Sequence, residues 1–535
     1  MASKRNGSPS RASTGSAAAD AAQRPVVAFL LDPSTHGVAA GDVDRIDTHI
    51  ATVVLAGQRA YKLKRAVKLS FVDFSSLQAR EAACRAELAL NRRTAPEIYL
   101  DVIAVTRAPD GRLSLGGEGE AVEWLVAMRR FDDSRLLDRV AQTSGLNADL
   151  ALELAAAVAA FHEAEPPVDD GADAAELERL IRQCVHELRA RGLFDRRAVA
   201  ALQRRSLGHL HASAELVAVR RSEGRVRHCH GDLHLRNIFL DGERPVLFDA
   251  LEFDERLAKI DVLYDLAFLL MDLWHRGHRA FANLLFNRYL LLTGDWGGLA
   301  LMPLFLSMRA GIRAHVTAGV AEARRNRREA RALQAEARDY LTLALDLLAP
   351  ARPCLIAVGG FSGSGKSTLA RGLAPHLLPP PGAVVARSDE IRKKLWGIAP
   401  EARLPEAAYA PPMSRRVYAE MRRIAGAALD GGYAAIVDAV HDRGGARRQA
   451  LKVAEARGQG FHGFWLEAPA ETLMCRIEGR ERDASDATTS VLRAQMAKGS
   501  RPARWQRPDT GAGAAAVVRE VLACLARSGV DVLPG

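Results

Sequence analysis

The chain has 535 residues, of which 48% are hydrophobic and 26% are charged, a composition typical of globular proteins. It carries a formal net charge of +10, and no apolar run reaches the roughly 18 residues that a membrane-spanning helix needs. The length exceeds what one ordinary core requires, so we expect more than one domain and no membrane insertion.

The first 24 residues are rich in Ala, Ser and Gly, and they predict a disordered tail. Residues 26–128 alternate short β-type runs with turns, whereas residues 150–350 have mostly helical patterns with a β-rich interruption at 227–253. This order predicts one α+β domain over residues 25–349, with a strand-rich lobe followed by a helix-rich lobe.

A second domain is expected over residues 350–535. Pro350 and Pro353 end the helical region, and Cys354–Val358 has the uninterrupted apolar pattern of a buried strand that opens an α/β pattern. From residue 351 onward there are 27 Lys and Arg against 18 Asp and Glu, which leaves 47 against 46 for the rest. Such a basic region suits a polyphosphate ligand or a nucleic acid, although solvated surface arginines explain the same charge.

In the strand-rich lobe, Lys62 and Lys64 lie two residues apart on one expected strand and therefore on one face. Glu87, in a helical stretch, is the candidate carboxylate partner for one of them. The sequence does not choose between the two lysines, and either one is also explained as a surface charge. No glycine-rich GxGxxG sequence precedes this strand.

The stretch HGDLHLRN, which begins at His230, is followed after a turn by the apolar run Val246-Leu-Phe and Asp249. Phosphoryl transfer needs an aspartate to orient or deprotonate the acceptor hydroxyl, and oxygen ligands to hold Mg²⁺. Asp232 fits the catalytic role, whereas Asn237 and Asp249 fit the metal role.

Residues 360–367 read GFSGSGKS and satisfy GxxxxGK[ST], between an apolar strand and a helical stretch. Glycines let consecutive backbone N–H groups turn toward phosphate oxygens, and the helix N-terminus adds partial positive charge. Lys366 should reach the β- and γ-phosphates, and Ser367 should bind Mg²⁺. The expected nucleotide-binding residues are Gly360, Phe361, Ser362, Gly363, Ser364, Gly365, Lys366, Ser367 and Thr368.

Further charged residues follow the P-loop. Asp389 comes after a second predicted strand and is a candidate base, with an N-cap as the alternative, and Arg392 is a candidate to hold the acceptor or the transferred phosphoryl group. Asp438 ends another apolar strand, where a second Mg²⁺ ligand is expected. Arg476 and Arg480, four residues apart, are candidates to neutralise transition-state charge from a lid, or are solvated arginines paired with glutamates.

On these motifs the first domain resembles the aminoglycoside phosphotransferases and choline kinases, and the second resembles small P-loop kinases. Nearly all of residues 25–530, including Tyr61-Lys-Leu-Lys and Asp483-Ala-Ser-Asp-Ala, is similar to bacterial proteins described as bifunctional aminoglycoside phosphotransferase/ATP-binding proteins. The resemblance implies a bilobal kinase-like domain followed by an α/β P-loop NTPase domain with a parallel sheet. It also implies that a lysine paired with Glu87 binds phosphate, and the family's strand pattern fits Lys64 slightly better than Lys62. The segment near residues 47–49 would then cover the phosphates, and residues 128–131 would meet the adenine. Antibiotic resistance does not follow from a shared fold.

These readings predict a bifunctional, ATP- and Mg²⁺-dependent phosphotransferase that acts on hydroxyls of small molecules. One alternative is a single active P-loop kinase with a regulatory kinase-like domain. Another is a nucleic-acid 5′-hydroxyl kinase or end-binding protein, for which aromatic residues, at 6%, supply few stacking partners. Six scattered cysteines without CxxC spacing argue against zinc and disulfides and predict a reducing, cytoplasmic location.

Overall fold

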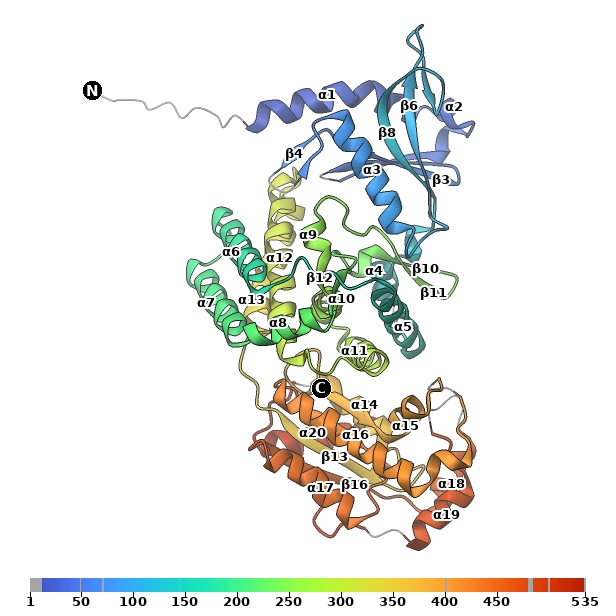
Figure 1. Cartoon of the computed structure of the whole chain (residues 1–535), viewed down its shortest axis with the longest axis vertical. Helices are drawn as coiled ribbons and strands as arrows, with labels where there is room; N and C mark the ends of the chain where they lie inside the picture. Colours follow the sequence, from blue (N-terminus) through green and yellow to red (C-terminus); the bar gives the residue numbers. More distant parts are fainter. Residues whose placement is uncertain are drawn as a thin grey trace, which may run out of the picture. The chain divides into compact units, whose positions relative to one another are not determined.

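The chain folds into two compact units, which we describe from a computed structural model (Figure 1). The first comprises Met1–Gly145, Ala164–Gly171 and Val226–Ile260, and the second Leu146–Glu163, Ala172–Arg225 and Asp261–Gly535. The structure describes residues 12–533 except 49, 70–71, 144, 400–401, 480–484 and 499–500. The first 11 residues of the predicted tail therefore lie outside the described residues. Among the described helices, none is both long and apolar enough to cross a membrane.

The first unit is built on an antiparallel six-stranded sheet in the order β1-β2-β3-β8-β6-β7. Its strands are β1 (Val43–Asp47), β2 (Ala51–Ala56), β3 (Arg59–Lys64), β6 (Tyr99–Arg107), β7 (Leu113–Leu115) and β8 (Glu120–Arg129). Helix α3 (Leu77–Asn91) begins where the Ser76 side chain accepts a hydrogen bond from the Ala79 N–H. Its Cys84 packs with Tyr99 and Val126 of the sheet, so the helix places Glu87 beneath the strands.

Helix α1 (Ala12–Leu31) occupies residues 12–24, where we expected disorder, and that prediction is wrong for this stretch. An Ala-rich segment has high helix propensity but is marginal as an isolated helix. Here Val26 and Leu30 join the core on one face of the sheet, and the buried Gln23 side chain donates to the Lys64 carbonyl at 2.9 Å. Tertiary contacts therefore stabilise a helix that composition alone does not reveal.

The β-rich interruption expected near residues 227–253 is present in the first unit. It contains β9 (Val226–His228) and an antiparallel hairpin of β10 (Ile238–Asp241) and β11 (Arg244–Leu247). This hairpin separates the HGDLHLRN loop from Asp249, so both reach the same side of the fold.

The second unit begins with helices packed around α10 (Val262–His275), whose residues 262–273 are all buried. The others are α5 (Ala148–Ala164), α6 (Ala174–Ala190), α7 (Arg196–Ala212), α8 (Ala214–Ser222), α11 (Arg279–Thr293), α12 (Met302–Ala323) and α13 (Arg327–Asp346). An apolar surface all round is expected for a helix at the centre of a bundle.

Arg220 of α8 is buried between two carboxylates. Its guanidinium nitrogens donate two hydrogen bonds to the carboxylate oxygens of Asp261, at 2.6 and 2.8 Å, and two to those of Asp295, at the same two distances. We expect Arg220→Leu to lower the free energy of unfolding by about 3–5 kcal/mol, because two buried carboxylates would lose their partner. Urea denaturation followed by circular dichroism measures this loss. The neighbouring Arg221 is more exposed, so Arg221→Leu should cost less than about 1 kcal/mol. Equal losses for the two variants would contradict the prediction.

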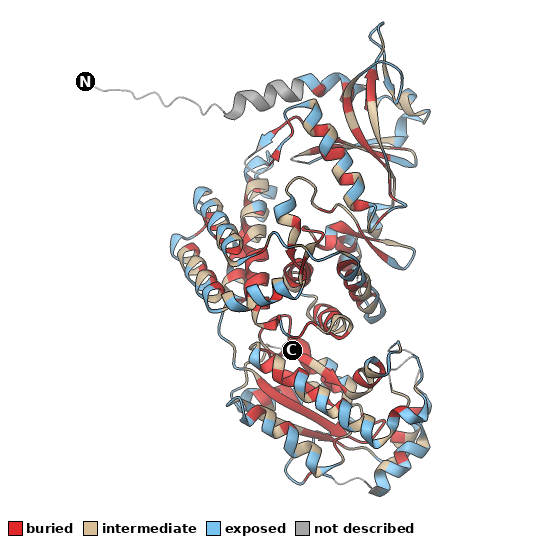
Figure 2. Cartoon of the chain, viewed as in Figure 1, coloured by how far each residue is buried: buried red, intermediate tan, exposed pale blue. Residues whose placement is uncertain are grey.

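The second unit continues with a parallel four-stranded sheet in the order β14-β15-β13-β16. Its elements are β13 (Cys354–Gly360), α14 (Lys366–Leu373), β14 (Val384–Arg387), α15 (Ser388–Trp396), α16 (Pro411–Asp430), β15 (Ala435–Asp438), α17 (Gly444–Glu455), β16 (Gly460–Leu466), α18 (Ala470–Glu478), α19 (Thr489–Lys498) and α20 (Ala514–Arg527). The central strand β13 is buried along its whole length (Figure 2), as expected when helices cover both faces. The predicted α/β fold with a parallel sheet is confirmed.

Helix α11 covers the edge of this sheet within the second unit. Asn283 Nδ2 donates to the carbonyls of Pro381 and Ala383 at 3.0 Å each, and Asn287 Oδ1 accepts from the Val385 N–H of edge strand β14 at 2.7 Å. The two asparagine side chains thus provide hydrogen-bond partners for backbone groups that would otherwise lack a partner at the edge of the sheet. The boundary that we predicted at residue 350 falls inside the second unit.

Candidate active sites

The first candidate site contains the HGDLHLRN loop, whose first residue, His230, is fully buried and positions the loop. Its Nε2 lies 2.9 Å from the Phe248 carbonyl, and its Nδ1 accepts from the Asp232 N–H at 3.3 Å. Because a carbonyl can only accept, these bonds assign the proton to Nε2. Gly231 has φ +80°, and a Cβ there would lie 3.1 Å from Leu251 Cβ, which explains the glycine.

Asp232 and Asn237 meet as the motif predicts. Asn237 Nδ2 donates to both the backbone carbonyl and a carboxylate oxygen of Asp232, each at 2.9 Å. The Asp232 side chain is 40% exposed, so an acceptor hydroxyl can reach it, and His234 Nε2 lies 3.5 Å from its carboxylate. The Asn237 amide oxygen takes no part in these bonds and is chemically suited to a hard cation.

Asp249 sits in a left-handed backbone conformation, with φ +60°, which costs a non-glycine residue about 1–3 kcal/mol. The Tyr99 hydroxyl accepts from the Asp249 N–H at 3.1 Å, and Asn91 Oδ1 accepts from the next N–H, that of Ala250, at 2.8 Å. Side chains from α3 and β6 therefore hold this strained turn in place and direct the carboxylate toward Lys62.

Lys62 and Lys64 both form ion pairs with Glu87, and each has a second carboxylate partner of its own. Lys62 Nζ lies 2.7 Å from one Glu87 oxygen and 2.5 Å from Asp249, whereas Lys64 Nζ lies 2.5 Å from the other Glu87 oxygen and also bonds Glu252. Burial opposes the charge on Glu87, but the two ammonium groups outweigh it and lower its pKa to about 2. The period-two prediction thus placed both lysines correctly beside Glu87, and neither is the surface charge of the alternative.

Glu252 is a site residue that sequence reasoning missed. It lies three positions after Asp249, and burial raises its pKa despite the nearby Lys64. The signal available in the sequence was an acidic residue in an otherwise apolar stretch directly after the expected metal ligand.

We expect the two lysines to differ in their effects. Lys62→Met should lower phosphoryl transfer at this site by about 10²-fold with little loss of stability, because Glu87 keeps Lys64 as a partner. Lys64→Met should instead lower the free energy of unfolding by about 3–5 kcal/mol, because Glu252 would be left buried without its partner. Steady-state rates and urea denaturation of both variants test this difference. The reverse pattern would assign the phosphate role to Lys64.

The segment expected to cover the phosphates is a hairpin turn between β1 and β2. The Asp47 carboxylate accepts from Thr52 Oγ1 at 2.8 Å and is therefore directed back to its own hairpin. His49 lies outside the described residues. At the expected adenine-binding segment, the Arg129 and Arg130 N–H groups donate to the Ile98 and Gln58 carbonyls at 2.9 Å each.

The second candidate site begins where β13 turns into α14 at the P-loop. Gly365 caps the helix with φ +91°, and Gly360 has φ +141° with no room for a Cβ beside Ser364. Lys366 Nζ donates to the Phe361 carbonyl at 3.0 Å, while the Phe361 ring packs on Trp465 in the core. Phe361, one of the predicted nucleotide-binding residues, therefore has its side chain in the core and not at the site.

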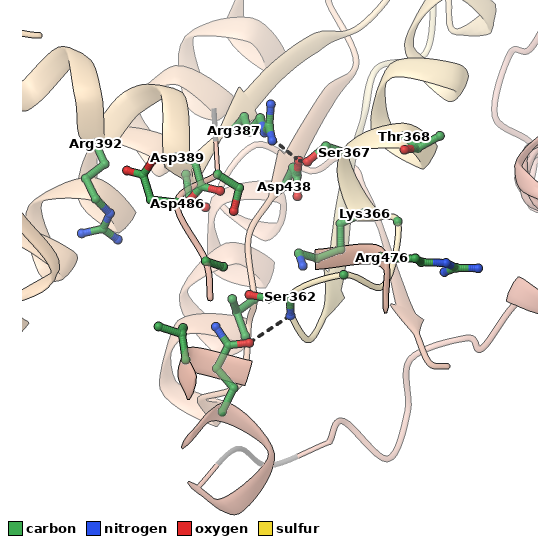
Figure 3. Close-up of a pocket in the computed structure, with 18 of the residues that line it drawn as sticks. Ser362, Lys366, Ser367, Thr368, Arg387, Asp389, Arg392, Asp438, Arg476 and Asp486 are labelled. Atoms are coloured by element: carbon green, nitrogen blue, oxygen red, sulfur yellow. Dashed lines mark hydrogen bonds and ion pairs between the residues drawn. The ribbon is translucent and has the colours of Figure 1, made fainter. Parts of the chain in front are cut away.

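A cavity of about 580 Å³ opens over the P-loop, a size suited to a small-molecule ligand (Figure 3). Its lining includes most of the site residues predicted for this domain: Ser362, Gly363, Gly365, Lys366, Ser367, Thr368, Asp389, Arg392, Asp438 and Arg476. Arg371, Arg387, Tyr409 and Tyr418 also line it, together with residues 485–487, 491 and 495.

Asp438 and Ser367 form the candidate metal pair. Ser367 Oγ donates to Asp438 Oδ2 at 2.6 Å, and Arg387 Nε lies 3.7 Å from the same oxygen. Burial raises the pKa of Asp438, and the positive charges of Arg387 and Lys366 partly offset that effect. A hydroxyl and a carboxylate beside a phosphate-binding lysine fit Mg²⁺, which prefers oxygen ligands. Arg387, the last residue of β14, was not singled out from the sequence.

Asp389 lies in the first turn of α15 and lines the cavity. The N-cap alternative is wrong, because the cap position belongs to Arg387 and Asp389 lies two residues further on, inside the helix. Arg392 is nearly buried: it donates to the Ala408 carbonyl at 2.8 Å and lies over the Tyr409 ring at 4.9 Å. These contacts hold its guanidinium in the cavity wall.

Arg476 is the last-turn arginine of α18 and lines the cavity, but in Figure 3 its side chain extends away from Asp389 and Asp438. Its partner on the expected lid, Arg480, lies outside the described residues. The structure therefore brings together the P-loop, Asp389, Arg392 and Asp438, while a role for the two lid arginines stays a prediction.

Two protein-family models match this chain, one in each half. Residues 57–302 match the family described as "Phosphotransferase enzyme family", and residues 355–502 match the family described as "AAA domain". Among solved structures, a gluconokinase from Sinorhizobium meliloti is 24% identical and covers 33% of this chain and 94% of its own, with a TM-score of 0.25. A choline/ethanolamine kinase family protein from Mesorhizobium loti is 16% identical and covers 61% of this chain and 99% of its own, with a TM-score of 0.35.

The two matched families and the two sites define a two-domain, ATP-dependent phosphotransferase of the kinase type. Uncharacterized protein Rv2004c of Mycobacterium tuberculosis and Uncharacterized protein Mb2027c of Mycobacterium bovis are each 31% identical over 479 residues, which cover 88% of this chain and 91% of theirs. The chain belongs to the family of these mycobacterial proteins.

Proposed function

We propose that the protein is bifunctional and that each site transfers the γ-phosphate of ATP to a hydroxyl of a small molecule. The observation that supports the proposal is that each site contains a lysine, a carboxylate and a further pair of oxygen-bearing side chains, which are chemically suited to bind phosphate, to accept a proton and to hold Mg²⁺. We assign these roles at the first site to Lys62, Asp232 and the pair Asn237 and Asp249, and at the second site to Lys366, Asp389 and the pair Ser367 and Asp438. The six cysteines, all within the described part of the chain, form no disulfide, which fits the reducing cytoplasm that we propose as the protein's location.

At the first site, Asp232 orients the acceptor hydroxyl and takes its proton as the acceptor oxygen bonds to the γ-phosphorus and the bond to the β–γ bridging oxygen breaks. Glu87 holds Lys62 in place for the nucleotide phosphates. Asn237 and Asp249 would hold Mg²⁺, which neutralises phosphate charge when it is bound.

At the second site, the P-loop N–H groups and Lys366 bind the phosphates, and Asp389 takes the proton of the acceptor hydroxyl. Ser367 and Asp438 would hold Mg²⁺. Arg392 shapes the acceptor side of the cavity, and Arg476 and Arg480 act on transition-state charge if the lid closes.

The test is γ-phosphate transfer by the full chain from labelled ATP to a pooled panel of sugars, aminoglycosides, nucleosides and short oligonucleotides. We expect labelled products from the small-molecule pools. ATP turnover without transfer to any pool would contradict the proposal. An oligonucleotide product, with binding that weakens steeply as salt rises, would favour the nucleic-acid 5′-hydroxyl kinase suggested by the basic second domain.

The second candidate function is one active P-loop kinase with a regulatory kinase-like domain. The absence of a glycine-rich sequence before Lys62 favours it, because phosphates there would have fewer backbone donors. Transfer that depends on Lys366 but not on Asp232 would support this alternative.

A further inference from the structure

Residues 485–495 form a strap along the cavity over the P-loop. Ser485, Asp486, Ala487, Val491 and Gln495 all line the cavity. None of these residues belongs to the phosphate-binding or acceptor-side groups described above. The two ends of the strap are bonded to different walls.

The first end is fixed by Asp486. Its Oδ2 accepts from the Leu404 N–H and from the Tyr409 hydroxyl, both at 3.0 Å, and its Oδ1 lies 3.6 Å from the buried Lys393 ammonium. Tyr409 also lines the cavity beneath Arg392. Asp486 therefore ties the strap to the wall on the Arg392 side.

The other end bonds the P-loop itself. Gln495 Oε1 accepts from the Ser362 backbone N–H at 2.9 Å (Figure 3). Leu492, one turn earlier on α19, is buried with Phe361, Trp465, Leu473 and Ile477 and holds the helix in this position. A carboxamide oxygen thus occupies a P-loop donor of the kind that binds phosphate oxygens.

We propose that Gln495 is an intramolecular competitor for the P-loop, which nucleotide must displace from the Ser362 N–H. Asp486 supports the competition, because a strap anchored at its first end keeps Gln495 at a high effective concentration near the P-loop. The proposal rests on nucleotide binding at the P-loop, which is part of the proposed function.

The test is calorimetric binding of MgATP to the full chain, in which the P-loop component is the part that Lys366→Ala removes. Gln495→Ala should tighten this component by about 2- to 10-fold, because the competing hydrogen bond is lost. Met496→Ala, at an exposed neighbour on the same helix, is the matched control and should leave it unchanged. Asp486→Ala should tighten binding less, and the double variant Gln495→Ala/Asp486→Ala should bind no more tightly than Gln495→Ala alone.

The outcomes separate the two ideas. If Lys366→Ala removes no binding component, the proposed function of the P-loop site fails. If that component is present but Gln495→Ala leaves it unchanged or weakens it, the competitor role of Gln495 is overturned while the proposed function stands. Additive effects of the Asp486 and Gln495 substitutions would overturn the role of the strap anchor.

Discussion

Lys366→Ala is expected to lower phosphoryl transfer at the P-loop site by about 10²- to 10³-fold, because a preorganised positive charge on the transferring phosphates is lost. The substitution should leave the fold intact, because the Lys366 side chain is only half-buried and is not part of the hydrophobic core of this domain. Initial rates with labelled ATP, at saturating acceptor, measure the effect.

The matched control for that variant is Lys452→Ala, at an exposed lysine of α17 in the domain that contains the parallel sheet. It should transfer phosphate at the wild-type rate. If Lys366→Ala kept more than about a tenth of wild-type transfer while binding MgATP normally, the P-loop would not be a phosphotransfer site of the kind proposed.

Asp232→Asn is expected to lower transfer at the first site by about 10²- to 10⁴-fold, because an amide cannot take the proton of the acceptor hydroxyl. Asparagine preserves the shape of the side chain, and its amide oxygen can still accept from Asn237, so the loop should keep its conformation. The rate should therefore fall without an equal rise in the KM for ATP.

Asp101→Asn, at an exposed position of β6 in the same unit, is the control for the loss of one carboxylate. A comparable loss of transfer in that variant would point to a general charge effect. Loss of ATP binding in Asp232→Asn would instead indicate that Asp232 acts on the nucleotide rather than on the acceptor.

The fold class and the two kinase-type domains were predictable because their signals are local in sequence. The spacing of Asp232, Asn237 and Asp249 lies within one short stretch, and the P-loop joins an apolar strand directly to a helix. Local geometry also sufficed to place Lys62 and Lys64 on one face. Local geometry could not decide which of the two lysines binds phosphate. That assignment depends on their contacts with Asp249 and Glu252, which lie almost two hundred residues away in the sequence.

Other features depend on tertiary contacts with no local signal. Helix α1 is stabilised by Val26 and Leu30 in the sheet core, and the edge of β14 is satisfied by Asn283 and Asn287 of α11. An asparagine on a helix carries no indication that its partner is a strand about a hundred residues away. Arg387 was not predicted as a site residue for the same reason, because only the folded structure brings it close to Asp438.

The central claim, two independent transfer sites in one chain, is tested most directly by the labelled products of four proteins: wild type, Asp232→Asn, Lys366→Ala and the double variant. The account predicts that each single substitution removes a different product and that the double variant forms neither. Loss of every product in Lys366→Ala, with no product lost in Asp232→Asn, would contradict bifunctionality and leave the first site as a regulatory domain.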